Sequence, residues 1–272
     1  MLNNKKSSSI PYIIWSIAFV IVPLVLVLVF AFTNKHGEFT FSNIEKIGTY
    51  ADIFVKSINL AIIATIICFL IGYPLAFIIS RANNLSQKNL LLLVMLPMWM
   101  NFLLRTYGWM TLLENEGIIN KVLGFIGLGP FEMINTQGAV VLGMVYNYLP
   151  FMVLPLYSIM VKIDRSVIEA AQDLGANWLQ ILGRVLLPLS MPGIISGLTM
   201  VLVPSISTFI ISKMLGGGSN MLIGDLIESQ FLGGSYNPYL GSAISLILMI
   251  IMLLIMGVIN SLEDDEMEGM LV

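Results

Sequence analysis

The amino-acid sequence predicts an all-α integral membrane protein with six transmembrane helices. The first observation is composition: of 272 residues, 57% are hydrophobic and only 11% are charged, whereas about 25% of the residues of a soluble domain are charged. The second is that the apolar residues gather in segments of roughly 20 residues, the length that a helix needs to cross a bilayer. The segments are 10–32, 57–80, 89–113, 139–161, 189–212 and 239–260.

The first apolar segment follows Lys5 and Lys6, as the core of a secretory signal peptide would. It is longer than such a core, and no clear small-x-small cleavage site follows it. We therefore expect a retained helix. The predicted organisation is an N-terminal tail, first helix and outer loop over residues 1–56, a transmembrane core over 57–260 and an acidic cytoplasmic tail over 261–272.

The distribution of lysine and arginine indicates the orientation, because basic residues are enriched in cytoplasmic loops. Six spans place both termini on one side of the membrane. With the termini in the cytoplasm, the inner segments hold nearly the same number of basic residues as the outer segments but are much shorter, so charge density favours this orientation. The inner residues are Lys5, Lys6, Arg81, Lys88, Lys162, Arg165 and Arg184.

Prolines interrupt several of the expected spans. Proline removes a backbone hydrogen bond, and in lipid the freed carbonyl must find another partner. Each proline could simply kink a packed helix, but several kinked spans together favour a bundle that moves around a cavity. The residues are Pro74, Pro97, Pro150, Pro155, Pro192 and Pro204.

Several classes of function find no support in the residues. Cys68 and His36 are the single cysteine and the single histidine, so an internal disulfide, a metal site and a Ser-His hydrolase pair are not expected. No G-x-x-x-x-G-K-[ST] motif is present to hold a nucleotide, so energy must come from a partner. The net charge of −3 does not favour nucleic acid. We expect no enzyme activity and no cofactor in this chain.

A polar segment separates the fourth and fifth spans, and two interpretations of it compete. In the first, it forms a surface helix: Ser166-Val-Ile-Glu169 matches a capping box, and Gly175 ends the helix in the left-handed conformation. An apolar stripe would then lie against the inner face of the bundle. The stripe consists of Val167, Ala171, Leu174, Trp178, Leu182 and Val185.

In the second interpretation, the segment is a docking helix. Its small residues form a low surface that the groove of another protein could accept closely, and charges surround this surface. A pull on such a helix would move both neighbouring spans. The small residues are Ala170, Ala171, Gly175 and Ala176, and the charged residues are Arg165, Glu169 and Asp173.

The spacing of this segment resembles a known motif. Glu169-Ala170-Ala171, three residues, Gly175, nine residues and then Val185-Leu186-Leu187-Pro188 is similar to EAA-x3-G-x9-I-x-LP, with valine in place of isoleucine. That motif marks the permease subunits of bacterial binding-protein-dependent ABC importers. The resemblance implies the type I importer permease fold, with residues 162–188 as a cytoplasmic coupling loop that docks on an ATPase. Glu169, Ala170, Ala171, Asp173 and Gly175 are its expected coupling residues.

Further stretches resemble one branch of this family, the spermidine/putrescine permeases, and specifically the first of their two permease subunits. Permeases for iron and other solutes share some of the patterns. The resemblance implies a bacterial cytoplasmic membrane location, a second similar permease, two ATP-binding subunits that bind ATP and Mg, and an extracytoplasmic polyamine-binding protein. The stretches are LPMWMNFLLRTYGWMTLLENEGIIN (96–120), YNYLPFMVLPLYSIM (146–160), LPLSMPGIISG (187–197) and LIGDLIESQFL (222–232).

A polyamine is a flexible polycation, which carboxylates and aromatic faces would bind. The expected pathway residues are Trp99, Asn101, Tyr107, Glu114, Glu116, Tyr146, Ser205 and Thr208, and Trp109, Tyr148, Asp225 and Glu228 are further candidates. Alternatives stay open: the aromatic residues could be interfacial anchors, the acids solvated loop charges, and the hydroxyls partners of the backbone that Pro204 frees. Arg105 is expected to pair with an acid or a carbonyl.

Two other functions compete with a polyamine importer. The chain could be the permease for another small solute in the same family. It could also be an ion-coupled secondary transporter, since broken helices mark those proteins too. A secondary transporter needs no docking segment, and the EAA spacing and the scarcity of buried acids oppose it.

Overall fold

The fold is entirely helical over the part of the chain that the structure describes. This computed structural model describes residues 10–269, in which helices alternate with turns and a single isolated β-bridge joins Thr33 to Phe39. Four helices are long and apolar enough to cross a membrane, or six if each of two bent helix pairs forms one span. The predicted all-α membrane fold with six spans is therefore confirmed.

The contacts divide the described residues into two compact units. The first unit contains the residues up to Asp52 together with Leu226–Leu253. The second contains Ile53–Asp225 and the residues from Leu254 onward. The polar segment and most of the expected pathway residues belong to the second unit.

The first unit begins with an apolar span that runs through α2 (Ile10–Ser16), the π-helix η1 (Ile17–Ile21) and α3 (Val22–Ala31). Within Pro11–Ala31 only Ala31 is buried, as suits a helix that faces lipid. Asn43 of α4 (Ser42–Glu45) donates to the carbonyl of Thr33 at 2.9 Å and so holds the end of this span. A 3-10 turn, η2 (Lys46–Tyr50), follows, and the unit also contains parts of α15 (Ile223–Phe231) and α16 (Pro238–Gly269).

The core of the second unit is built from α5 (Ala51–Arg81), α9 (Gln137–Met160) and α13 (Met191–Ser207). Met152 of α9 is fully buried between two glycines. A Cβ atom at Gly72 of α5 would lie 2.9 Å from Met152 Cγ, and one at Gly197 of α13 would lie 2.7 Å from Met152 Sδ. The two glycines therefore let three helices approach one side chain, as small residues do in membrane bundles.

The expected third span, 89–113, is broken. Helix α6 (Asn84–Trp99) ends, and α7 (Phe102–Leu113) begins after Met100 and Asn101 and is followed by α8 (Ile118–Phe125). The two halves of this span meet at 90°. Pro97, one of the prolines expected to interrupt the spans, lies in the last turn of α6 just before the break. Hydropathy records the apolar run and not the backbone bonds within it, so it does not locate the break.

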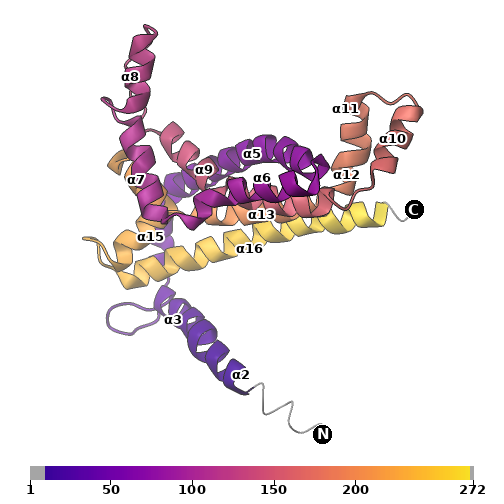
Figure 1. Cartoon of the computed structure of the whole chain (residues 1–272). Coiled ribbons are helices and arrows are strands. Elements are labelled where there is room, and N and C mark those ends of the chain that lie inside the picture. Colours follow the sequence, from indigo (N-terminus) through magenta and orange to yellow (C-terminus); the bar gives the residue numbers. More distant parts are fainter. Residues whose placement is uncertain (1–9, 270–272) are drawn as a thin grey trace. The chain divides into compact units, whose positions relative to one another are not determined.

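The expected fifth span, 189–212, has different limits. Helices α11 (Trp178–Ile181), η3 (Leu182–Leu186) and α12 (Leu187–Leu189) lead into α13 with a bend of 73° at Ser190, and α13 ends at Ser207. Helix α14 (Ile210–Leu215) and the turn η4 (Gly218–Asn220) follow. Within the second unit, α10 (Arg165–Asp173) and α11 stand at one end of α5 and α13, and α7 and α8 stand at the other end (Figure 1).

Candidate functional site

The polar segment (residues 162–188) begins with a capped helix. The Asp164 carboxylate accepts a hydrogen bond from the backbone N–H of Ser166 at 3.0 Å and is the N-cap of α10. The predicted capping box between Ser166 and Glu169 is therefore wrong, because an aspartate two residues earlier caps the helix and leaves Ser166 inside its first turn. The hydrogen bonds from Ser166 hold the pKa of the Asp164 carboxyl below its usual value, so the cap stays ionised at neutral pH.

Gly175 ends α10 as predicted. Its φ is +80°, a conformation that glycine adopts without strain. Its N–H donates to the carbonyl of Gln172 at 2.8 Å, and the N–H of Ala176 donates to that of Ala171 at 3.0 Å. These two bonds form a Schellman motif. The chain then reverses into α11, where Asn177 and Gln180 form a reciprocal capping box.

The predicted coupling residues lie on the open surface of this helical hairpin. Glu169, Ala170, Asp173 and Gly175 are exposed, and Ala171 is partly buried. Two apolar neighbours are exposed as well: Leu174 is 89% exposed and Val167 is 41% exposed. The surface-helix interpretation expected both side chains to lie against the bundle, and the structure contradicts it for them. An exposed leucine beside small residues is the pattern expected of a surface that a partner covers.

At the opposite end of the second unit, two polar side chains cap the break between α6 and α7. The Asn101 amide oxygen accepts from the N–H groups of Leu103 at 2.9 Å and Leu104 at 3.3 Å, which caps the start of α7. Arg105 Nη1 donates to the carbonyl of Pro97 in the last turn of α6. The prediction that Arg105 pairs with a carbonyl is thus confirmed. A cation at a helix C-terminus is also favourable for the helix dipole.

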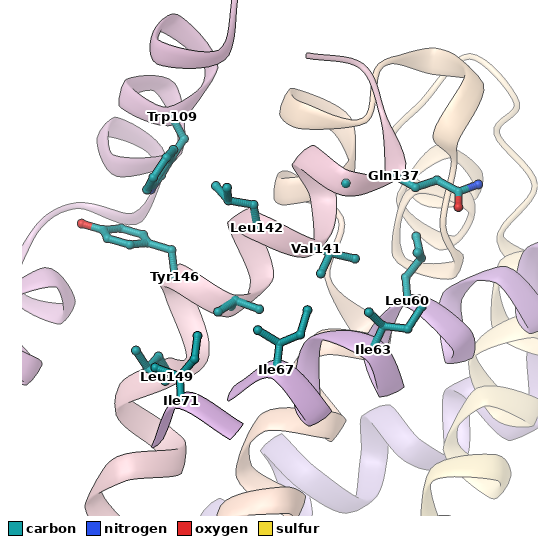
Figure 2. Close-up of a pocket in the computed structure, with 12 residues that line it drawn as sticks. Leu60, Ile63, Ile67, Ile71, Trp109, Gln137, Val141, Leu142, Tyr146 and Leu149 are labelled. Atoms are coloured by element: carbon teal, nitrogen blue, oxygen red, sulfur yellow. The ribbon is translucent and has the colours of Figure 1, made fainter. Parts of the chain in front are cut away.

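Trp109 and Tyr146 form an aromatic pair beside this break. Their ring centroids lie 5.3 Å apart at an interplanar angle of 71°, and the Arg105 guanidinium lies 5.9 Å from the Tyr146 centroid. Both rings line a pocket of about 720 Å³. Figure 2 shows them on α7 and α9, with aliphatic side chains of α5 and α9, such as Ile67 and Leu142, along the rest of the wall. The wall can accept a methylene chain and offers aromatic faces to a cation.

Glu114 and Glu116 line a second, more polar cavity of about 470 Å³. They follow the end of α7 and share the cavity with Met110, Asn135 and Met214. Both carboxylates are exposed. The structure therefore places the two predicted acids together, one turn or more beyond the aromatic pair along α7.

The other expected pathway residues do not line either of these two cavities. Trp99 is 70% exposed and Tyr107 is 52% exposed, so both stand on the outer surface of the broken span. Ser205 is fully buried, and its hydroxyl donates to the carbonyl of Val201 in its own helix at 2.6 Å. Thr208 is buried at the C-terminus of α13. The Ser205 hydroxyl therefore faces its own helix and not a cavity. Its partner is not the carbonyl that Pro204 frees, which is that of Met200, four residues before the proline.

Four residues that sequence reasoning did not single out for function connect the polar segment to α5. They are Tyr73, Phe77, Arg81 and Ser190. Tyr73, Phe77 and Arg81 follow each other at intervals of four residues, a helical spacing that could have suggested one common face. Ser190 lies just beyond the EAA motif, in a stretch read only for its resemblance.

The fold is shared with chains of solved ABC transporters. The structure matches a subunit of a bacterial ABC transporter involved in the import of the acidic polysaccharide alginate, with a TM-score of 0.77, 20% sequence identity and coverage of 96% of this chain and 94% of that one. It also matches the MetNI methionine ABC transporter in an inward-facing conformation, with a TM-score of 0.58, 18% identity and coverage of 82% and 98%.

The chain belongs to the family described as binding-protein-dependent transport system inner membrane component, whose model matches residues 72–264. Its similar relatives include the spermidine/putrescine transport system permease protein PotB of Haemophilus influenzae, 42% identical over 95% of this chain and 94% of the relative. PotB of Escherichia coli is 37% identical over 88% and 90%. The predicted family is therefore confirmed.

Proposed function

We propose that this chain is the membrane-spanning permease subunit of an ATP-driven polyamine importer. It forms half of a translocation pathway for spermidine or putrescine and couples that pathway to a separate ATPase. The observation that carries the proposal is the exposed hairpin of the polar segment, which presents Glu169, Ala170 and Ala171 together with Leu174 on an open surface. The substrate follows from the relatives named spermidine/putrescine permeases, which the chain matches over nearly its whole length.

The proposed assembly has four kinds of component besides lipid. This chain pairs with a second, homologous permease, and two cytoplasmic subunits bind ATP and Mg. An extracytoplasmic protein delivers the polyamine. Both termini lie in the cytoplasm of a bacterium, so the polar segment faces the ATPase, and residues 1–56 and 261–272 flank a permease core.

The two cavities support a path for a polycation. Glu114 and Glu116 line a cavity just after α7, and within the second unit α7 lies at the end remote from α10 (Figure 1). A negative charge there would attract an arriving polyamine. Tyr146 and Trp109 lie deeper, with an aliphatic wall for the methylene segments. Closure of the ATPase would displace α10, and the bundle would alternate the access of these cavities.

The first test is ATP hydrolysis by the complex purified on this chain from its native membrane. We expect a copurified ATPase whose activity rises only when polyamine and the extracytoplasmic binding protein are both present. Putrescine and spermidine are compared in parallel, and a neutral diamide of similar length is the control for charge. The physical reason is that the receptor signals its loaded state across the bundle to α10.

A copurified ATPase that ignores both polyamines would keep the permease class and reject the substrate, which would favour a permease for another small solute. A chain that retains no ATPase in any lipid or detergent and still transports would favour an ion-coupled secondary transporter.

A further inference from the structure

One face of α5 contacts the polar segment at two points and the bend just beyond it at a third. We call this face the α5 stripe, which consists of Tyr73, Phe77 and Arg81. Residues four apart on an α-helix lie on the same side of it. The three contacts are to the bend at Ser190, to the start of α11 and to the entry of the segment.

The first contact is at the bend between α12 and α13. Tyr73 Oη and Ser190 Oγ lie 3.0 Å apart, and both side chains are buried, with Ser190 fully so. The Ser190 hydroxyl also lies 2.6 Å from the carbonyl of Leu186, to which it donates. Tyr73 is then the donor to Ser190. This bond ties α5 to the residue at which the chain turns by 73°.

The second contact is aromatic. The rings of Phe77 and Trp178 have centroids 5.4 Å apart at an interplanar angle of 60°. Trp178 is the first residue of α11, directly after the Asn177 cap. A displacement of the hairpin that moves α11 therefore presses on Phe77.

The third contact closes the segment at its entry. Arg81 Nη1 donates to the carbonyl of Ile163 at 3.0 Å, and Arg165 Nη2 donates to the carbonyl of Arg81 at 2.8 Å. The Arg81 guanidinium lies 5.5 Å from the Phe77 centroid, so the second and third contacts also touch each other. Both ends of the hairpin are thus fixed to the same helix.

A cavity of about 520 Å³ lies along the stripe. Tyr73, Pro74 and Phe77 line it on α5, and Trp178, Leu182 and Leu187 line it on the other side. Packed interiors resist displacement, so a cavity at this place gives the α11–α12 side chains room to move while the three contacts hold the ends.

The other half of α5 forms one wall of the pocket that Trp109 and Tyr146 line, which we call the aromatic pocket. Leu60, Ile63, Ile67 and Ile71 line that pocket together with Tyr146. A single helix, Ala51–Arg81, therefore reaches from the pocket to the polar segment.

We propose that the α5 stripe transmits the displacement of the polar segment along α5 to the aromatic pocket, with Tyr73 and Ser190 as its central positioning pair. The inference rests on the proposed function, since it names the element that receives the movement of the docking hairpin. A movement of α10 is passed through three contacts to α5, and α5 shifts its isoleucines against α9. The width of the pocket beside Tyr146 then depends on the state of the ATPase.

The test compares Tyr73→Phe, Ser190→Ala and their combination in the full complex in proteoliposomes. Each removes one hydroxyl and keeps the packing nearly unchanged. We expect full assembly and receptor-stimulated ATP hydrolysis, with polyamine uptake per ATP reduced about fivefold, the effect of one hydrogen bond. The double variant should lose no more uptake than Ser190→Ala alone, because Tyr73→Phe removes only the bond to Ser190. Ser190→Ala removes that bond and also the bond to the Leu186 carbonyl. Thr65→Val is the matched control: its hydroxyl is also buried on α5 but donates only to Ala61 of its own helix.

A second pair, Phe77→Leu and Trp178→Leu, tests the stripe independently and should show the same uncoupling. Normal uptake per ATP in all variants of an active complex, or losses that add in the Tyr73 and Ser190 double variant, would overturn the stripe and leave the importer intact. If the unmodified complex hydrolyses ATP without regard to polyamine and receptor, the proposed function fails instead, and the stripe fails with it.

Discussion

Gly175 shows how one residue sets the shape of the hairpin between α10 and α11. Its positive φ lets α10 end in a Schellman motif and the chain reverse toward α11. A Cβ atom added there would have no neighbour within 4 Å. In the isolated chain, glycine is therefore favoured at this position by the backbone conformation and not by a lack of space for a side chain.

This difference gives a prediction for two substitutions. Gly175→Val should reduce polyamine uptake roughly tenfold, because a non-glycine residue in this region costs about 1–2 kcal/mol and the strain displaces the end of α10. Gly175→Asn should retain most of the uptake, since asparagine tolerates this conformation. The measurement is uptake and ATP hydrolysis by the assembled complex. An equal loss in both variants would mean that the docked partner leaves no room for any side chain, and conformation would not be the reason.

The N-cap of α10 shows that a match to the capping-box motif can predict the wrong residue as the cap. Ser166 and Glu169 match the capping-box spacing, but Asp164 precedes them and accepts the N–H of Ser166. Two candidate caps two residues apart cannot both be the N-cap. Residue spacing alone does not decide between them. The backbone conformation decides, because Asp164 is extended and the helix begins at the next residue, Arg165.

At the scale of the element, the broken third span depends on caps that lie within the apolar region. Non-helical backbone in a membrane is tolerated where its polar groups are satisfied. The Asn101 side chain accepts hydrogen bonds from the backbone N–H groups at the start of α7, and Arg105 donates to a backbone carbonyl at the end of α6. Hydropathy located the span correctly and could not locate the break, since neither cap changes the mean hydropathy by much. The pairing of Pro97 with an asparagine shortly after it is the signal that was available.

We expect Asn101→Ala to lower the free energy of unfolding by about 1 kcal/mol, the usual effect of losing an N-cap. Asn101→Ser should lower it much less, because serine also accepts from the first N–H groups of a helix. The measurement is the thermal inactivation of the purified complex, compared between the two variants and the unmodified protein. Equal stability of the alanine variant and the unmodified protein would show that another group caps α7 in the assembly.

For the expected pathway residues, the sequence predicts which types of side chain to look for. It does not predict the direction in which each side chain points. Tyr146 lies in a pocket with Trp109, and Glu114 lies in a cavity with Glu116. Ser205 belongs to the same predicted set but turns into its own helix. The identity of a polar residue in an apolar span does not reveal which face it occupies when prolines shift the helical phase.

At the scale of the whole molecule, the chain contains an exposed hairpin, for which we propose a docking role, and a set of cavities. Its family is a component of transport systems of the inner membrane. Its fold is shared with chains of ABC transporters for chemically different solutes, the acidic polysaccharide alginate and methionine. The shared fold therefore does not identify the solute that this chain transports.

The most direct test of the central claim is uptake of labelled spermidine by proteoliposomes that contain the full complex, with ATP enclosed and with ionophores that remove all ion gradients. We expect accumulation that requires ATP and the loaded binding protein, that persists with the ionophores and that is lost when Glu169→Lys reverses a charge on the exposed face of α10. Accumulation that the ionophores abolish and ATP does not support would contradict it.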